Sequence, residues 1–409
     1  MKGNESRIDR EVKRFRKMFG DTVEAIAQAP GRAEILGCHT DYNHGFALAA
    51  GITRNTRTLL SKRDDANIAV CSTAFPKQKI VKFSLTDITR DETVMWTNYV
   101  RAVVKELVDA GYKIGGANVL IDSTVPKSGG VSSSAALELA VAFGLLALYK
   151  QDIDRTKVAL LCKTAENSDI VRSPCGFLDQ GAAAFAKKDA MVFLDFLPKG
   201  NSPVSRIDLI PAIFPVAASF VIPVDPTLER QLGESGYVVR RKMCEDSLPF
   251  WTDVLGKKIR SLRDVTRVDF ETHRARLEKK NPVMRKRVEH IIYENERVLA
   301  AVEALKKKDI HTFGNLLTEA GKSSIELYEL DENTPQLTFL IETGRSLQGV
   351  FGMRNMGGGF SAIGLALFAQ ESMAAFQKAL RDAYQKKFSR TLDFIEFSPS
   401  KGADIIHHA

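Results

Sequence analysis

Cysteine is scarce in this sequence and shows no pairing pattern. The five cysteines are Cys38, Cys71, Cys162, Cys175 and Cys244, and none of them forms a CxxC pair with another. An odd number at wide spacing predicts neither a disulfide framework nor a zinc site. We therefore expect a reducing compartment and a cytoplasmic location.

A long apolar run is also missing. The most apolar stretch, 135–149, is interrupted by Glu138 and Gly144, and it is shorter than the roughly 20 residues that a bilayer requires. The N-terminal residues MKGNESRIDREVKRF are charged and lack the apolar core of a secretory signal. The sequence therefore predicts a buried helix at 135–149, no leader and no membrane partner.

No nucleic-acid motif accompanies the excess of basic residues. The formal charge is +8, but Lys and Arg are spread over the whole chain. The densest cluster, Lys306, Lys307 and Lys308, follows an amphipathic stretch, where cations complement the dipole of a helix C-terminus. Without interleaved aromatic residues it does not indicate nucleic-acid binding. We expect an anionic small molecule such as ATP instead.

The composition is that of a globular protein with mixed secondary structure. The chain has 409 residues, 44% of them hydrophobic and 26% charged, which suits two domains of roughly 200 residues each. We place them at 1–198 and 199–409. Internal repeats and low-complexity tracts are absent from the sequence, and its interspersed helical and strand patterns predict an α+β or α/β protein.

The hydrophobic patterns place individual elements along the chain. Helical patterns occupy 9–19, 154–167 and 288–305, whereas strand patterns occupy 117–122 and 364–368. The Pro- and Gly-rich segment 198–203 indicates a domain junction or a surface loop. One face of the helix predicted at 288–305 is expected to hold Val288, Ile291, Ile292, Val298, Leu299, Val302 and Leu305.

The segment 125–135, with sequence VPKSGGVSSSA, lies between a predicted strand and a predicted helix. Its glycines allow backbone N–H groups to approach a phosphate, and its serine hydroxyls can cap the following helix. A helix N-terminus attracts an anion, and a serine hydroxyl can reach Mg²⁺. The pattern is neither GxxxxGK[ST] nor GxGxxG, which argues against P-loop and Rossmann sites.

Three motifs in this order resemble those of the GHMP kinases, and of galactokinases within them. They are PGRAEILGCHTDYN at 30–43, PKSGGVSSSAA at 126–136 and RNMGGGF at 354–360. Shorter similar motifs are WTNYV at 96–100, PCGFLDQ at 174–180 and YVVRRKMCE at 237–245. The resemblance extends from about residue 19 to about residue 403. It implies an α+β fold of two lobes with the active site in the cleft between them.

The resemblance also implies an activity, the transfer of a phosphoryl group from ATP to the C1 hydroxyl of a sugar, with galactose the leading substrate. Asp179 matches the catalytic aspartate, which accepts the hydroxyl proton or orients the hydroxyl. Arg32 matches an arginine that keeps this aspartate ionised and stabilises the transferring charge. We expect a monomer or a weak dimer.

Further residues match binding positions of the family. Ser134 and Glu166 match ligands of Mg²⁺, with Ser133 as the alternative if the register differs by one. Trp96 matches an aromatic residue at the adenine. The phosphate-loop positions are Ser128, Gly129, Gly130, Ser132 and Ser133. The sugar-contacting positions are Cys38, His39, Asp41, Gly176 and Tyr237.

Departures from the family pattern concern the substrate. Cys38 replaces a glutamate that contacts the sugar 6-hydroxyl, and Ser128 replaces a glycine of the phosphate loop. Loss of the carboxylate keeps galacturonate and L-arabinose open as alternative substrates, with Arg172 as a candidate partner for a sugar carboxylate. A non-catalytic sugar-sensing regulator is the other alternative, although the intact serine loop with Arg32 and Asp179 favours an enzyme.

Overall fold

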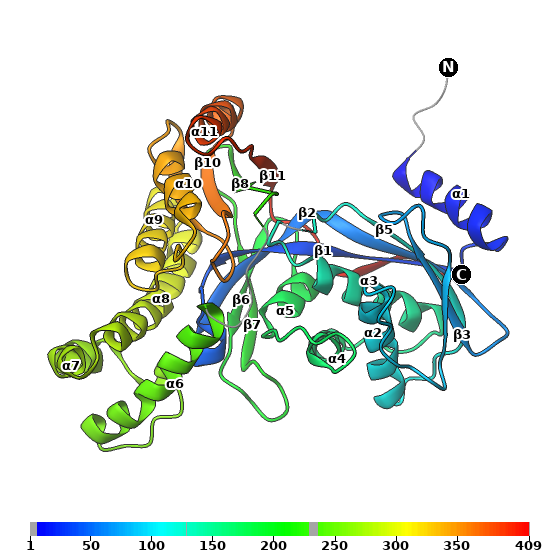
Figure 1. Ribbon diagram of the computed structural model, residues 1–409, viewed down its shortest axis with the longest axis horizontal. Coiled ribbons are helices and arrows are strands. Elements are labelled where there is room, and N and C mark those ends of the chain that lie inside the picture. The colour runs from blue at the N-terminus through cyan, green and yellow to red at the C-terminus, as the bar shows by residue number, and fades with distance from the viewer. Residues whose placement is uncertain (1–5, 128, 229–235, 409) are drawn as a thin grey trace.

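The computed structural model describes residues 6–127, 129–228 and 236–408 as two lobes that lie side by side (Figure 1). Each lobe combines one β-sheet with helices, so the expected α+β class is confirmed. Within these ranges, no helix is long and apolar enough to cross a membrane. All five cysteines are free thiols.

The first lobe is built on an eight-stranded sheet. Six strands follow the order β12-β1-β2-β5-β3-β4, and β6 extends from β2 to β7. Only the β3–β5 pair is parallel among the pairings of this sheet in the described ranges. The strands are β1 (Ala25–Leu36), β2 (Phe46–Lys62), β3 (Asn67–Ser72), β4 (Val81–Ser84), β5 (Ala117–Ser123), β6 (Ala190–Asp195), β7 (Arg206–Pro211) and β12 (Asp404–His408).

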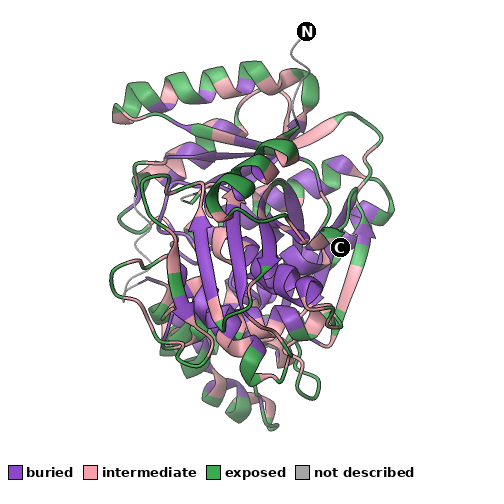
Figure 2. Ribbon diagram, turned by 90° about the vertical axis from the view of Figure 1, so that its right-hand side faces the viewer, coloured by how far each residue is buried: buried purple, intermediate pink, exposed green. Residues whose placement is uncertain are grey.

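The alternation of side chains along the strands gives this sheet two buried faces. Leu59 packs with Phe15 of α1 (Arg7–Phe19), whereas Leu60 packs with Leu139 of α3 (Ser133–Leu148) in the main core. The main face also receives α2 (Thr97–Asp109), α4 (Arg155–Asn167) and α5 (Leu178–Phe185). Helix α3 is apolar on all sides because other elements enclose it. Figure 2 shows the buried central strands and the exposed outer helix faces.

The second lobe contains a four-stranded antiparallel sheet in the order β11-β8-β10-β9. Its strands are β8 (Ala218–Val224), β9 (Val350–Asn355), β10 (Gly364–Ala369) and β11 (Asp393–Phe397). Its helices are α6 (Gly236–Leu255), α7 (Arg267–Lys280), α8 (Pro282–Lys306), α9 (Ile310–Glu326), α10 (Pro335–Arg345) and α11 (Met373–Phe388). Short 3₁₀ helices lie at Asp41–Asn43, Leu262–Asp264 and Gln370–Ser372.

An apolar cluster joins the two lobes. It brings Leu48 and Phe193 of the first sheet together with Phe313 and Leu317 of α9 and Leu365 of β10. The lobes therefore share part of their hydrophobic core, and the residues between them are fixed by packing from both sides.

The chain also crosses between lobes more than once. The segment 198–203 joins β6 to β7 within one sheet, so it is a surface loop. Strand β12, at the C-terminal end, pairs with β1 of the first lobe. A boundary at residue 198 would thus divide a hairpin, and the division into 1–198 and 199–409 stays a prediction.

One predicted core position was wrong. Leu299 of α8 is 42% exposed, whereas Val298 and Val302 are buried. Successive helical residues are about 100° apart, so Leu299 lies beside the buried stripe. The predicted helices at 9–19, 135–149, 154–167 and 288–305 and the strands at 117–122 and 364–368 correspond to α1, α3, α4, α8, β5 and β10.

Candidate active site

Three segments of the first lobe bring an arginine, a serine and an aspartate together. Arg32 lies on β1, Ser132 directly precedes α3, and Asp179 is in the first turn of α5. The Arg32 Nε donates to Asp179 Oδ1 at 2.8 Å, and Nη2 lies 2.6 Å from the same oxygen. The Ser132 hydroxyl donates to Asp179 Oδ2. Asp179 therefore has both carboxylate oxygens engaged while its side chain stays 25% exposed.

The phosphate loop is closely attached to β1. Arg32 N donates to Val131 O at 3.0 Å, and Arg32 Nη1 donates to Gly130 O at 2.7 Å. A Cβ on Gly31 would lie 2.6 Å from Val131 O, so this approach requires glycine. The loop is thereby fixed against the strand that carries Arg32.

Ser132 differs from the expected helix cap. It is the N-cap residue of α3, but it has a left-handed backbone with φ 53° and makes no side-chain cap hydrogen bond. Its hydroxyl is engaged by Asp179 instead. The expectation that this serine hydroxyl caps the helix was wrong, because the left-handed backbone turns the side chain towards α5. The N-terminal N–H groups of α3 thus lack a cap from Ser132 and can bind an anion.

Two buried carboxylates lie behind this loop. Gln180 Nε2 donates to Glu138 Oε2 at 3.0 Å and to Glu166 Oε2 at 2.7 Å. Burial, followed by the negative charges of neighbouring carboxylates, raises the pKa of both Glu138 and Glu166. A hydrogen bond from Ser134 opposes this shift at Glu166. Buried repelling carboxylates of this kind are typical of sites that receive a cation.

The donor set near Glu166 fits Mg²⁺. The Ser134 hydroxyl and the Glu166 carboxylate are adjacent oxygen donors, and the buried Glu138 Oε1 lacks a protein partner. No cluster of three or more His, Cys, Asp or Glu side chains suited to a metal occurs in the described ranges. Mg²⁺ usually takes one or two protein ligands and completes its shell with phosphate oxygens and water. These residues can therefore hold the ion together with a nucleotide.

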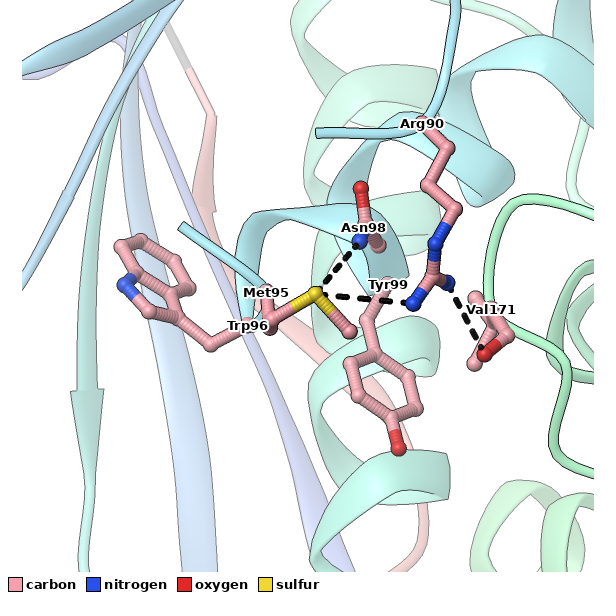
Figure 3. Close-up of a pocket in the computed structure, with 6 residues that line it drawn as sticks. All are labelled: Arg90, Met95, Trp96, Asn98, Tyr99 and Val171. Carbon is pink, nitrogen blue, oxygen red and sulfur yellow. Dashed lines mark hydrogen bonds between the residues drawn. The ribbon is translucent and has the colours of Figure 1, made fainter. Parts of the chain in front are cut away.

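A small pocket lies where the adenine is expected. Its volume is about 180 Å³, and it is lined by Arg90, Met95, Trp96, Asn98, Tyr99 and Val171 (Figure 3). In Figure 3, Trp96 projects away from Tyr99, and Arg90 reaches across to Val171. Burial, followed by the charge of Glu166, raises the pKa of Tyr99 to about 12. One residue of the pocket, Tyr99, is thus near enough to the predicted metal ligand Glu166 to be affected by its charge.

Trp96 is held by neighbours from the turn after β3. Its Nε1 donates to Gln78 Oε1 at 2.7 Å, and its ring stacks on Phe75 with centroids 5.5 Å apart. The Lys127 ammonium lies 3.7 Å from the Phe75 ring centroid. A half-buried aromatic stack beside the phosphate loop offers a flat surface to a base.

Asp41, Gly176 and Tyr237, expected at the sugar, lie close together. A Cβ on Gly176 would lie 2.1 Å from Asp41 Oδ2, so only glycine leaves room for this carboxylate. Burial raises the pKa of Asp41 to about 6, and nearby Glu34 and Asp179 add to the shift. Burial and the charge of Asp41 raise the pKa of Tyr237. A carboxylate acceptor next to a phenol suits the hydroxyls of a sugar.

His39 lies in an aromatic surrounding from both lobes. Its ring centroid is 5.2 Å from that of Tyr237 and 4.8 Å from that of Tyr328. Nδ1 is 2.9 Å from the Tyr42 hydroxyl, and Nε2 is 3.3 Å from Gly358 O. Burial lowers the pKa of His39 to about 3, so the ring is neutral at physiological pH.

Cys38 lies beneath this group and is completely buried. Its thiol donates to Gly357 O at 3.3 Å, and burial raises its pKa, so it stays uncharged.

Arg172 is exposed and its Nε donates to Asp169 O at 3.0 Å, which gives no support to its role at a sugar carboxylate. Ser128, expected in the phosphate loop, lies outside the described residues.

Several residues of the site were missed by the sequence analysis. Glu138 and Gln180 flank the expected metal ligand, and Tyr328 and Phe75 contact expected binding residues. The sequence offered one indication of Glu138, because a charged residue within an apolar helix is unusual, and the structure shows that it is fully buried. Tyr328 and Phe75 lie in segments without a distinctive pattern, and only the fold brings them to the site.

Comparison with known proteins agrees with this arrangement. The model of the GHMP kinases N terminal domain matches residues 98–187, and the galactokinase galactose-binding signature matches residues 13–62. The crystal structure of Lactococcus lactis galactokinase complexed with galactose is similar over 98% of this chain and 100% of that one, with 29% identity and a TM-score of 0.88.

More distant structures share the fold. Mevalonate kinase of Methanococcus jannaschii is 15% identical over 92% of this chain and 98% of its own, with a TM-score of 0.62. A heptose 1-phosphate kinase from Bacteriodes thetaiotaomicron is 13% identical over 93% of this chain and 98% of its own, with a TM-score of 0.59. The two matching models and the full-length similarity to a galactokinase show that this chain is a sugar kinase with a GHMP kinase N-terminal domain and a galactokinase galactose-binding signature.

Proposed function

We propose that this protein transfers the γ-phosphoryl group of ATP to the C1 hydroxyl of galactose. The observation that carries the proposal is the meeting of Arg32, Ser132 and Asp179 beside the phosphate loop. The match of residues 13–62 to a galactose-binding signature supports galactose over galacturonate, L-arabinose and a purely regulatory role.

Asp179 is the residue that handles the sugar hydroxyl. Its carboxylate is paired with Arg32 and partly exposed, so it can accept a hydrogen bond from an incoming hydroxyl. As the C1 oxygen attacks the γ-phosphorus, the hydroxyl proton passes to Asp179 or, if Asp179 only orients the hydroxyl, to an oxygen of the transferred phosphoryl group. The bond between the γ-phosphorus and the bridging oxygen breaks, and ADP leaves.

Arg32 and the loop neutralise charge on the transferring group. Arg32 is almost fully buried, so its guanidinium acts in a medium of low dielectric, where charge stabilisation is strong. The N–H groups at the start of α3 face the phosphates, with Gly129, Gly130, Ser132 and Ser133 shaping the approach. Ser134 and Glu166 would hold Mg²⁺, which neutralises phosphate charge when bound.

The two substrates are assigned to separate groups of residues. The adenine is placed at Trp96, near Tyr99 and Phe75, and the sugar at His39, Asp41, Gly176 and Tyr237, with Cys38 beneath. Asp41 accepts hydrogen bonds from ring hydroxyls, and the neutral His39 can donate or accept one. Buried polar groups that need a partner select a substrate that supplies one.

The direct test is an ADP-release assay on galactose, galacturonate and L-arabinose, with and without Mg²⁺. We expect magnesium-dependent turnover that is fastest on galactose, with the phosphate on C1 by ³¹P and ¹³C NMR. Galactose binding without ADP release would instead support a regulator. Faster turnover on galacturonate or L-arabinose would identify that sugar as the substrate instead of galactose.

A further inference from the structure

The loop that carries the sugar-binding residues of the first lobe is held by a helix of the second. Residues 37–46 connect β1 to β2 and contain Cys38, His39 and Asp41. Three successive contacts along this loop come from α8, at His290, Glu294 and Asn295. Positions 290 and 294 lie one turn apart on the same face of α8, and position 295 lies about 100° further round, so the loop meets a broad surface of the helix.

Glu294 holds the beginning of the loop. Its Oε1 accepts hydrogen bonds from the backbone N–H groups of Gly37 at 2.9 Å and Cys38 at 3.3 Å. His290 Nε2 lies 3.3 Å from the carbonyl oxygen of Cys38. The peptide groups on both sides of Cys38 are therefore attached to α8.

Asn295 holds the end of the same loop. Its Oδ1 accepts from Phe46 N at 2.9 Å. A Cβ on Gly45 would lie 2.2 Å from this oxygen, so glycine is needed for the approach. The two ends of the loop are thus fixed by adjacent residues of one helix, and the positions of His39 and Asp41 between them depend on that helix.

Two arginines keep Glu294 charged although it is completely buried. Arg297 Nε donates to Oε2 at 2.7 Å, and Arg354 Nη1 lies 3.6 Å from Oε1. Burial by itself would raise the pKa of Glu294, but the charges of Arg297 and Arg354 lower it to about 2. A charged acceptor makes stronger hydrogen bonds to backbone N–H groups than a neutral one.

We propose that Glu294 and Asn295 are positioning residues for the sugar. They hold both ends of residues 37–46 and thereby set His39 and Asp41 against Gly176 and Tyr237. The inference rests on the proposed sugar site, and neither residue belongs to the segments 30–43, 174–180 and 237–245 that hold the expected sugar-contacting residues. Asp179, Arg32 and the phosphate loop make no contact with either residue among the described hydrogen bonds and ion pairs, so ATP binding should be independent of them.

The test compares Glu294→Gln and Asn295→Ala with Glu296→Gln. Glu296 lies on the same helix but is exposed and pairs with Arg267 at 3.2 Å, which makes it a matched control. Both test variants should raise the galactose KM about tenfold, the size of one lost buried hydrogen bond, and leave the ATP KM unchanged. The control should change neither constant. Asn295→Ala keeps the test valid if the loss of the negative charge beside Arg297 prevents Glu294→Gln from folding.

Hydrogen exchange provides a readout that needs no substrate. Amides of residues 37–46 should exchange at least tenfold faster in the two variants than in wild type or Glu296→Gln, with exchange in α3 and α5 unchanged. Absence of turnover on galactose in the wild type would contradict the proposed function but leave this measurement interpretable. The inference is overturned if folded variants show wild-type exchange in this loop, or if the KM values of galactose and ATP rise in equal proportion.

Discussion

At the scale of single residues, the two aspartates of the site differ in how their carboxylates are surrounded. Asp179 uses one oxygen for Arg32 and the other for Ser132, so its orientation is fixed before substrate arrives. Asp41 has a different environment, in which burial and neighbouring carboxylates disfavour its charge. These different environments suit the separate tasks that we propose for the two aspartates, one in phosphoryl transfer and one in sugar binding.

Replacing Asp179 by Asn should reduce kcat by on the order of 10²-fold or more, because an amide cannot take the hydroxyl proton and leaves Arg32 without its charge partner. The measurement is steady-state ADP release, with circular dichroism to verify the fold. Galactose binding by calorimetry should persist. Turnover close to wild type in the folded variant would remove Asp179 from the mechanism.

Sugar affinity should depend on pH through Asp41. Its pKa is raised from an ordinary value of 3.8 to about 6 by burial, so below pH 6 it is protonated and loses acceptor capacity. We expect the galactose Kd to rise as the pH falls from about 7 to about 5. His39 does not titrate in this range, because its pKa is about 3. Calorimetry should show this dependence in wild type and a flat profile in Asp41→Asn.

The contribution of Asp41 to the free energy of unfolding changes with pH in the opposite direction to the sugar affinity. Between pH 3.8 and about 6 the folded state binds more protons at this residue than the unfolded state does. This contribution to the free energy of unfolding therefore falls as the pH rises through that window and is constant above it. A galactose Kd that does not change between about pH 7 and about pH 5 would contradict the assignment of Asp41 as the acceptor.

At the scale of elements, α3 connects the phosphate loop to the main core. It is enclosed by β1, β2 and the other helices of that face. Gly144 lies where α3 crosses β2, and a Cβ there would lie 2.6 Å from Leu60 Cδ1 and 2.7 Å from Thr58 Oγ1. The close crossing sets the direction in which α3 presents its N-terminus.

Gly144→Ala should therefore destabilise the protein, although alanine is the better helix former by about 1 kcal/mol. Overpacking costs about 1–3 kcal/mol, so we expect a lower Tm by calorimetry. Leu60→Val in the same chain should recover part of the loss, because it removes the nearest contact. A Tm equal to or above that of wild type for Gly144→Ala would show that β2 moves freely away from the helix.

At the scale of the whole molecule, the two lobes share a core, and the C-terminal end of the chain returns to the first lobe. The C-terminal strand β12 completes the first sheet beside β1. The cluster around Phe193 and Phe313 includes residues from both lobes. Opening one lobe therefore exposes apolar surface of the other, which favours a single cooperative transition.

A fragment of residues 1–198 should fail to unfold cooperatively. It lacks β7 and β12 and exposes the first-lobe half of the shared cluster. We expect retained far-ultraviolet dichroism, binding of a hydrophobic dye and no sharp thermal transition, as in a molten globule. The full chain is the control. A sharp transition in the fragment would support an independent domain with its boundary at 198.

The sequence by itself determined the elements and motifs that local patterns encode. Apolar periodicity located α8, and the order of strand, glycine loop and helix located the phosphate loop. The resemblance of PGRAEILGCHTDYN and PCGFLDQ to family motifs led to Arg32 and Asp179, which form an ion pair in the structure. These features depend on residues near one another in the chain or within a motif.

Only the tertiary structure decided the contacts between distant segments. Ser132 bonds to Asp179 rather than capping α3 because its backbone is left-handed, and Leu299 is exposed although its neighbours are buried. Glu294 and Asn295 reach a loop about 250 positions earlier in the chain, at separations of 257 and 249 residues. Such contacts follow from how two lobes pack, and packing depends on the whole set of buried side chains rather than on local periodicity.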